Sequence, residues 1–402
     1  MAVPHHTFAV VEASSSDRLP ATVRALGWTS FLTDLSSEAI YPLLPAFVKG
    51  LGGSGVAIGL VDGVASAVAA VVRLPSGAVS DAVGRRPLIL AGYGLSAIVR
   101  PLMAFAATPL HVLVVRAIDR LGKGMRSAPR DALVADLVGP AGRGRAFGHI
   151  RAMDHAGAAV GPLVAAAFLL ACPGRERTLF LLALLPGLAT LAVIRRLVRD
   201  PPRQMAAATG TALATTLSRP QAWLLASVAV WAVGAASEQF LLMRAADAGV
   251  PVAFIPLVWF GMSLVKSAVA SRAGRLADAV SPRRALAAGW LLFAAAYAGL
   301  ALTQYLPGVL LLIAVVGAAY GLAEPAERAL VATLAAEGRQ GNAFGWYALV
   351  QGLAALPAGL AAGWLWDLGP HGPACSFAVT AGLAVLASGL LVATRPTVSS
   401  GS

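Results

Sequence analysis

The chain has 402 residues, of which 58% are hydrophobic and 12% are charged. Soluble globular domains carry about 25% charged residues, so this composition excludes a soluble enzyme or binding module. The formal net charge is +12, but the basic residues collect in the tails and in alternate loops between apolar stretches, as in membrane proteins and not in nucleic-acid patches. We therefore predict a protein embedded in a lipid bilayer, with no nucleic-acid partner.

Twelve apolar stretches are long enough to cross a membrane, since a spanning α-helix needs about 20 mostly apolar residues. Arginine-rich loops follow the even-numbered stretches, which predicts that both termini lie in the cytoplasm. Abundant alanine and arginine with little lysine are typical of a GC-rich bacterial genome, and hence of a bacterial inner (cytoplasmic) membrane. The predicted spans are 24–48, 55–79, 87–108, 111–134, 146–171, 177–197, 222–243, 251–273, 284–304, 306–332, 342–366 and 374–394.

The first predicted span carries two carboxyl side chains, Asp34 and Glu38, which lie four residues apart and therefore on one face of a helix. Tyr41 follows one turn later. Ionisable groups at the centre of a membrane helix cost about 2.5–3.5 kcal/mol on insertion scales, so those that persist usually pair, face water or serve a function. Two interpretations stay open. Either the pair exchanges a proton near neutral pH in a narrow cavity, or it permanently neutralises arginines of other spans.

The loop after the second span reads Gly77-Ala-Val-Ser-Asp81-Ala-Val-Gly84-Arg85-Arg86. It resembles the signature of the major facilitator superfamily between its second and third helices. The residue types have physical reasons in such a loop: the first glycine lets helices approach closely, the carboxylate favours a neighbouring helix N-terminus, and the second glycine permits a turn. The resemblance covers nearly the whole chain, and it implies that the two arginines face the cytoplasm as part of a cytoplasmic gate.

The fourth span carries a charged stripe, because Arg116, Asp119, Arg120 and Lys123 follow at spacings of three and four residues. The span resembles the fourth-helix pattern of the same superfamily, with Arg116 in the arginine position and a charged pair in place of the usual glutamine and glycine. Arg116 lies a turn or two deeper in the membrane than Lys123, and we expect it to contact a carboxylate or an anion in the cavity. Lys123 lies nearer the cytoplasmic end, where we expect its long side chain to reach toward water.

The fifth span contains Gly157, Gly161 and Pro162. This sequence is similar to the Gly-Pro motif of superfamily members that export substrate against protons, with alanines in place of the last two glycines. The motif implies efflux. Glycines at every fourth position, here and in the second and eleventh spans, form ridges that allow close helix contact. Either these ridges let the two halves rock across their interface, or they provide static packing.

The second half of the chain repeats the first. Residues 132–148 and 329–345 are identical at nine of seventeen positions at a constant offset of 197, and the same offset places Asp278 on Asp81. An even number of spans in each repeat makes the halves parallel, related by a pseudo-twofold axis along the membrane normal. The predicted parts are a tail, a six-helix half, a cytoplasmic linker, a second six-helix half and a tail, at 1–23, 24–197, 198–221, 222–394 and 395–402.

Fewer deep charges occur in the second half. Glu238, which follows a serine as Glu38 does, is the acidic candidate of the seventh span, and Glu324 and Glu327 lie three residues apart in the tenth. Lys266 of the eighth span is a deep cation near them. We expect one of these carboxylates to pair with Lys266, either as a structural pair or as part of a substrate contact.

These features predict an all-α integral membrane transporter of the major facilitator fold. We expect a monomer that works by alternating access and exports a small molecule or drug of unknown class in exchange for protons. A proton-coupled or facilitative importer is the alternative, since direction does not follow from fold. The sequence has no His-Glu-x-x-His, no Gly-x-Ser-x-Gly, no phosphate-binding loop and no Cys/His cluster, so we expect no enzyme, no cofactor and no metal.

Overall fold

The computed structural model describes residues 19–138, 142–200, 217–235, 237–335 and 340–393, with the backbone alone at 143–144, 271–280 and 340–342. Every regular element in these ranges is a helix. The first half contains α1 (Ala21–Ile40), η1 (Tyr41–Leu43), α2 (Leu44–Gly50), α3 (Gly55–Val83), α4 (Arg85–Val99), η2 (Arg100–Phe105), α5 (Pro109–Leu137), α6 (Arg143–Ala171), α7 (Glu176–Leu182) and α8 (Leu184–Leu197). The second half contains α9 (Arg219–Gly234), α10 (Gln239–Asp247), η4 (Val252–Phe254), α11 (Ile255–Val280), α12 (Pro282–Leu302), α13 (Leu306–Leu334), α14 (Gln340–Trp366) and α15 (Gly372–Ala393).

Ten segments of the described chain are long and apolar enough to cross a membrane, and they coincide with ten of the twelve predicted spans. The other two predicted spans correspond to the run α1–η1–α2 and to α5. Both are long, but they carry hydroxyl and charged side chains of the site described below, which lowers their hydropathy. The structure therefore bears out ten spans on length and apolarity. In the positions of the other two predicted spans it shows helices that are more polar than these ten.

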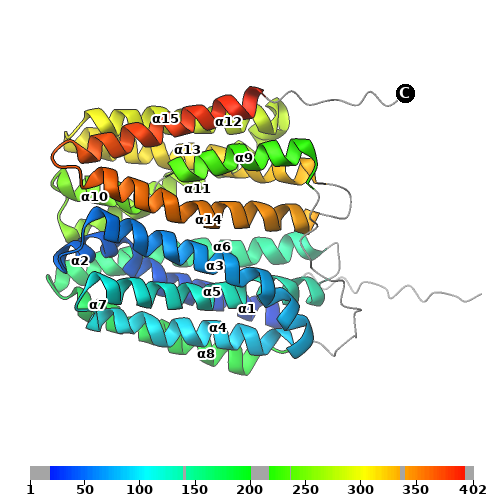
Figure 1. Cartoon of the computed structure of the whole chain (residues 1–402). Coiled ribbons are helices and arrows are strands. Elements are labelled where there is room, and N and C mark those ends of the chain that lie inside the picture. The colour runs from blue at the N-terminus through cyan, green and yellow to red at the C-terminus, as the bar shows by residue number, and fades with distance from the viewer. Residues whose placement is uncertain (1–18, 139–141, 201–216, 236, 336–339, 394–402) are drawn as a thin grey trace, which may run out of the picture.

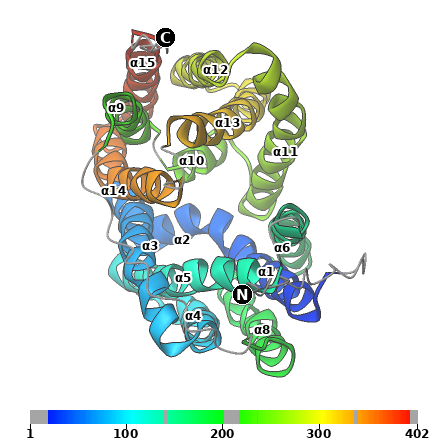
Figure 2. The ribbon, with the colours of Figure 1, turned by 90° about the vertical axis from the view of Figure 1, so that its right-hand side faces the viewer.

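Two bundles lie side by side, one made of α1–α8 and the other of α9–α15 (Figure 2). Both repeat the same packing. Helix α1 lies against α6 as α9 lies against α14, α3 lies against α5 as α11 lies against α13, and α4 lies against α5 and α8 as α12 lies against α13 and α15. This correspondence is the structural form of the sequence repeat. The bundles contact each other along α3–α14 and α6–α11.

Different helix ends and connecting segments lie at the two ends of the molecule. Helix α1 begins and α15 ends at one end, here called the termini end (Figure 1). The corners that join α3 to α4 and α11 to α12 lie at the same end. Helices α2, α7 and α10 lie at the other end, here called the opposite end.

Side-chain caps explain where several helices begin. Ser54 accepts a hydrogen bond from the backbone N–H of Ala57 at the start of α3. Thr108 accepts one from the backbone N–H of His111 at the start of α5. Ser218 and Gln221 form a capping box at the start of α9. Each cap satisfies a backbone donor that the first turn of a helix leaves without an intrahelical partner.

Glycines bring α3 and α14 into direct backbone contact across the two halves. A Cβ added at Gly59 would overlap the carbonyl oxygen of Gly359, and one added at Gly63 would lie 2.8 Å from the carbonyl oxygen of Ala355. The helices can approach this closely only because these positions lack side chains. The glycine ridges predicted in the second and eleventh spans therefore face each other between the halves.

The glycines of the fifth span have a different neighbour. A Cβ at Gly157 would overlap the carbonyl oxygen of Phe31, and one at Gly161 would lie 2.8 Å from the carbonyl oxygen of Leu35. Both contacts are with α1, so this ridge packs within the first half and not across the interface. Pro162 lies inside α6, and its role as a hinge stays a prediction.

The predicted signature loop forms the corner between α3 and α4. Gly84 has a φ of +100°, a conformation that favours glycine. Arg85 pairs with Asp81. We expected Asp81 at a helix N-terminus, but Asp200 at the end of α8 takes that place, since its carboxylate accepts the backbone N–H of Arg86 at 2.9 Å. A carboxylate at the N-terminus of α4 is favoured by the helix dipole.

Two other residues of this motif differ from expectation or lie outside the description. A Cβ added at Gly77 would lie 3.7 Å from the Cβ of Ala128, which is an ordinary van der Waals distance. The close helix approach expected at Gly77 therefore does not occur. The side chain of Asp278 lies outside the described residues.

The corner between α11 and α12 repeats the α3–α4 corner with serine in place of glycine. Ser281 has a φ of +140°, a region where a side chain costs about 1–3 kcal/mol. We expect Ser281→Gly to raise the melting temperature of the protein in detergent micelles, because glycine adopts this conformation without steric cost. The reverse change at the equivalent corner, Gly84→Ser, should lower it. An unchanged melting temperature in Ser281→Gly would show that the corner is not strained.

Candidate functional site

A cavity of about 530 Å³ lies between the two bundles. Its walls come from α1–η1, α3 and α5 of the first half, and from the α9–α10 break, α11 and α14 of the second. A smaller chamber of about 210 Å³ continues it, since both spaces share Tyr41, Asp62 and Glu238 as lining residues. The larger space alone falls within the range of about 300–1,000 Å³ that small-molecule sites occupy.

Polar contacts tie the halves together at the opposite end. Lys49 of α2 pairs with Asp247 of α10 at 3.1 Å, and Gln239 Nε2 donates to the carbonyl oxygen of Tyr41 at 3.3 Å. The Asp367 carboxylate, just after α14, accepts the first two backbone N–H groups of α3 at 2.8 and 3.0 Å. Helices α2 and α10 contact each other at this end and therefore close this end of the cavity.

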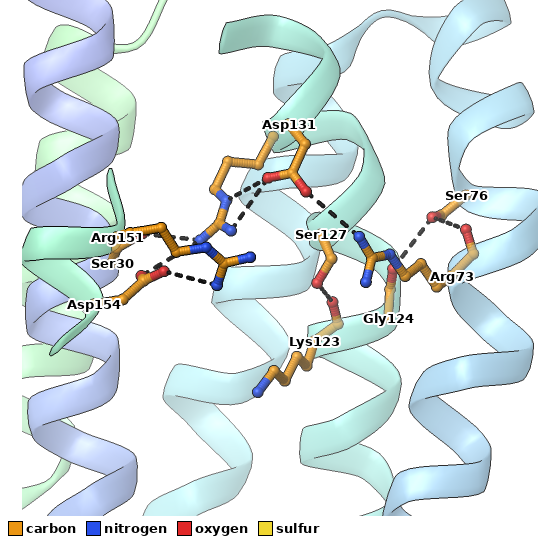
Figure 3. Close-up of polar contacts among 10 residues, drawn as sticks. Ser30, Arg73, Ser76, Lys123, Gly124, Ser127, Asp131, Arg151 and Asp154 are labelled. Atoms are coloured by element: carbon orange, nitrogen blue, oxygen red, sulfur yellow. Dashed lines mark hydrogen bonds and ion pairs between the residues drawn. The ribbon is translucent and has the colours of Figure 1, made fainter. Parts of the chain in front are cut away.

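Toward the termini end, the cavity wall reaches Arg73 of α3. The Asp131 carboxylate links Arg73, at 3.5 Å, to Arg130, at 3.2 Å, as Figure 3 shows. Asp154 of α6 lies 3.7 Å from Arg130 and 3.5 Å from Arg151. This network ties α3, α5 and α6 to one another on the first-half side of the cavity.

Asp62 of α3 is the polar centre of the cavity. Its carboxylate accepts hydrogen bonds from the hydroxyls of Tyr41, at 3.3 Å, and Ser237, at 2.5 Å, so it joins the two halves. Arg116 Nη2 lies 3.7 Å from it, and the Arg116 guanidinium stands 5.3 Å from the centre of the Tyr41 ring, within the range of a cation–π contact. Arg116 thus has a carboxylate partner of the expected kind, but that partner was not predicted.

Asp119 is enclosed by arginines and does not line the cavity. Arg100 Nε donates to its carboxylate at 2.9 Å, and Arg116 approaches the same carboxylate at 3.8 Å. Arg100 also donates to the carbonyl oxygen of Thr33 at 2.9 Å. A buried, hydrogen-bonded pair of this kind holds helices in place, so the structure places Asp119 in the support of the site and not on its surface.

The two acids predicted on α1 differ in position, because one lines the cavity and the other does not. Glu38 lines the cavity, and its carboxylate accepts a hydrogen bond from Trp259 Nε1 of α11 at 2.9 Å. This bond crosses between the halves. Asp34 is not part of the lining of either space. Of the two acids of α1, Glu38 is therefore the one that faces the cavity.

The four charged residues of α5 also differ in position: two are buried and two line the cavity. Arg116 and Asp119 are buried among their partners, whereas Arg120 and Lys123, one turn apart, both line the cavity. Within the part of the chain that the structure describes, neither of these two side chains has a carboxylate oxygen within 4.0 Å. Figure 3 shows the Lys123 ammonium apart from the network of Asp131 and its neighbours. Lys123 thus lines the cavity between the halves and is exposed to solvent there.

The second half supplies one cavity carboxylate and a separate cluster of ion pairs. Glu238, at the break between α9 and α10, lines both spaces. Glu324 pairs with Lys266 at 3.3 Å and with Arg328 at 2.7 Å, which confirms that one carboxylate of α13 pairs with Lys266. Glu327 is buried and lines neither space. The cavity roles predicted for Glu324, Glu327 and Lys266 stay predictions.

The sequence prediction missed Asp62 and the bond from Trp259 to Glu38. A signal for Asp62 exists, since it is an acid in a span that is otherwise apolar, glycine-rich and uncharged over its first half. No comparable signal marks the Trp259 bond, because it joins spans far apart in the sequence. Among the described residues, no group of three histidine, cysteine or acidic side chains could hold a metal ion.

A helical membrane protein of two repeated halves, with a polar cavity where the halves meet, has the architecture of a secondary transporter. The family model described as the Major Facilitator Superfamily matches residues 26–272 and 240–402. The chain belongs to this superfamily.

Known relatives agree with this assignment. An uncharacterised MFS-type transporter of Methanocaldococcus jannaschii is 30% identical over 387 residues, which cover 94% of this chain and 96% of the relative. The multidrug resistance protein MdtH of Proteus mirabilis is 33% identical over 158 residues, but these cover only 38% of this chain and 40% of MdtH. A mutant of the nucleoside transporter NupG has a similar structure, with a TM-score of 0.80, 14% identity and coverage of 92% and 99%. At that identity the likeness concerns the fold alone.

Proposed function

We propose that this protein is a secondary active transporter that works by alternating access and exports a small organic molecule in exchange for protons. The observation that carries this proposal is the cavity between the halves, which is closed at the opposite end and lined by carboxylates and basic groups. A purely structural bundle would fill such a space with apolar side chains, because protein interiors are close-packed.

The basic residues at the termini end support a cytoplasmic position for that end. They include Arg85 and Arg86 at the start of α4 and Arg195 and Arg196 at the end of α8. In that orientation the cavity extends toward the cytoplasm, where an exporter loads its substrate. The partial relationship to a multidrug resistance protein and the Gly-Pro sequence of α6 support efflux.

Everted membrane vesicles from a bacterial host test coupling and direction together. Respiration acidifies the vesicle interior, which an acridine dye reports by quenching of its fluorescence. The compounds to add are those whose toxicity to the host falls when the protein is expressed. For an exporter that exchanges protons, adding such a compound outside the vesicles should release protons and restore the fluorescence. Neither a proton-coupled nor a facilitative importer gives recovery in this arrangement, so its absence would contradict proton-coupled export.

The carboxylate of Glu38 is the group that we expect to exchange the proton, since it lines the cavity and lies within the membrane. In Glu38→Gln vesicles, the recovery of fluorescence should fall to the level of vesicles without the protein. Asp34→Asn should do the same if the two acids act together, and should leave recovery intact if Asp34 is structural. Glu176→Gln, which removes a carboxylate at the start of α7 away from the cavity, is the matched control. Full recovery in Glu38→Gln would exclude this residue from coupling.

A further inference from the structure

One wall of the cavity presents two cations without ion-pair partners. Arg120 and Lys123 lie one turn apart on α5, and both line the larger space. In the described ranges, no carboxylate oxygen comes within 4.0 Å of either side chain. Arg73, the other cation of the lining, is paired with Asp131. Charged groups within membrane spans usually pair, face water or bind a ligand, and two neighbouring cations on the cavity wall offer a place for an anionic group.

The acidic groups of the cavity lie on other helices. Glu238 projects from the α9–α10 break and lines both spaces, and in the described part of the chain its carboxylate makes no hydrogen bond or ion pair. Glu38 is held by Trp259, and Asp62 is already occupied by Tyr41, Ser237 and Arg116. Glu238 is therefore the carboxylate that is free to meet a cationic group.

The smaller chamber adjoins Glu238 and is aromatic. Trp231 and Tyr320 line it, together with Tyr41. The Nε1 donor of Trp231 is buried and has no hydrogen-bond partner among the described residues. Buried donors are rarely left without a partner, so this chamber is suited to a flat apolar group that carries or adjoins a hydrogen-bond acceptor.

We infer that the substrate is a zwitterionic aromatic molecule. Its anionic group lies between Arg120 and Lys123, its ammonium group meets Glu238, and its ring enters the chamber beside Trp231. A plain cation would make no contact with Arg120 and Lys123, and a plain anion would make none with Glu238. This inference rests on the proposed transport function, but it concerns equilibrium binding and can be tested without a proton gradient.

Matched sets of ligands test the charge preference on the wild-type protein in detergent micelles. Tryptophan is a zwitterion, tryptamine is the corresponding cation and indole-3-propionate is the corresponding anion, and phenylalanine, phenethylamine and 3-phenylpropionate form a second set. Calorimetric titration should show the zwitterion of at least one set binding at least about tenfold more tightly than both singly charged forms, as expected when each charge finds a partner. Equal or tighter binding of a cation or an anion would overturn the inference, and so would the absence of binding in both sets.

Variants of the cavity residues then test which residue binds each charged group of the ligand. Arg120→Gln and Lys123→Gln should each weaken binding of the zwitterion by about tenfold, while binding of the cation is unchanged or improved. Glu238→Gln should weaken the zwitterion and spare the anion. Arg196→Gln and Glu176→Gln remove the same charges outside the cavity and should change neither. If the α5 variants weaken all ligands alike, the basic groups do not select the anionic end. A failure of proton coupling in the vesicles would leave these binding results standing, so the two proposals can fail separately.

Discussion

Replacing Asp62 with asparagine should lower the stability of the protein by about 3 kcal/mol or more and should abolish transport. The asparagine oxygen can still accept the hydrogen bonds of Tyr41 and Ser237, but the variant removes the negative charge and places an amide donor where the oxygen nearest Arg116 was. The guanidinium of Arg116, whose side chain is 5% exposed, then loses one of its two carboxylate neighbours in a buried site. Thermal unfolding in detergent micelles should show a melting temperature lower by about 5 °C or more.

A double variant distinguishes lost charge balance from lost hydrogen bonding. Asp62→Asn combined with Arg116→Met removes both charges, and we expect it to recover most of the stability, since an apolar side chain of similar size can replace a buried ion pair. Transport should remain absent. If the double variant is as unstable as Asp62→Asn alone, the pair with Arg116 does not explain the effect.

The substitution Gly59→Ala should destabilise the contact between the halves by about 2 kcal/mol, because the added methyl group overlaps the carbonyl oxygen of Gly359 and forces α3 and α14 apart. The loss of backbone contact should also reduce transport, since both halves border the cavity. Melting temperature and substrate-dependent proton release measure the two effects.

Gly261→Ala is the matched control for this change. Gly261 also lies inside a long helix, α11, but nothing lies within 4 Å of a Cβ added there. Alanine is favoured over glycine in a helix by about 1 kcal/mol, so this variant should be as stable as the wild type or more stable. A similar loss of stability in both variants would mean that glycine to alanine changes are harmful in these helices for reasons other than the interface.

The order of the spans, and ten of the twelve spans themselves, could be predicted from the sequence because the signals are local. Apolar runs give the spans, and the repeat gives the correspondence between the halves, which the structure shows as the same helix packing in each bundle. The Gly84 corner could also be anticipated, since the positive φ is a property of one residue. Its partner Asp200 could not, because it comes from the end of a helix more than a hundred residues later.

The candidate site was harder to predict because its contacts join distant spans. The spacing of Arg116, Asp119, Arg120 and Lys123 placed them on one helix, but it could not show which of them face the cavity. That depends on how α5 is rotated against its neighbours, and Arg100, from η2, draws Asp119 away from the cavity. A pairing of Lys266 with one carboxylate of the second half was expected because few other charges were available there, and the structure shows that Glu324 is this carboxylate.

The hydrogen bond from Trp259 to Glu38 connects the two halves through a side chain that can carry a proton. The two side chains belong to different halves, so in the proposed transport cycle we expect opening of the cavity at the opposite end to separate α1 from α11 and to break this bond. Hydrogen bonds to an ionised acceptor are roughly twice as strong as those between neutral groups. If Glu38 carries the proton in the proposed cycle, its protonation should weaken this hydrogen bond and lower the energy needed to separate the halves.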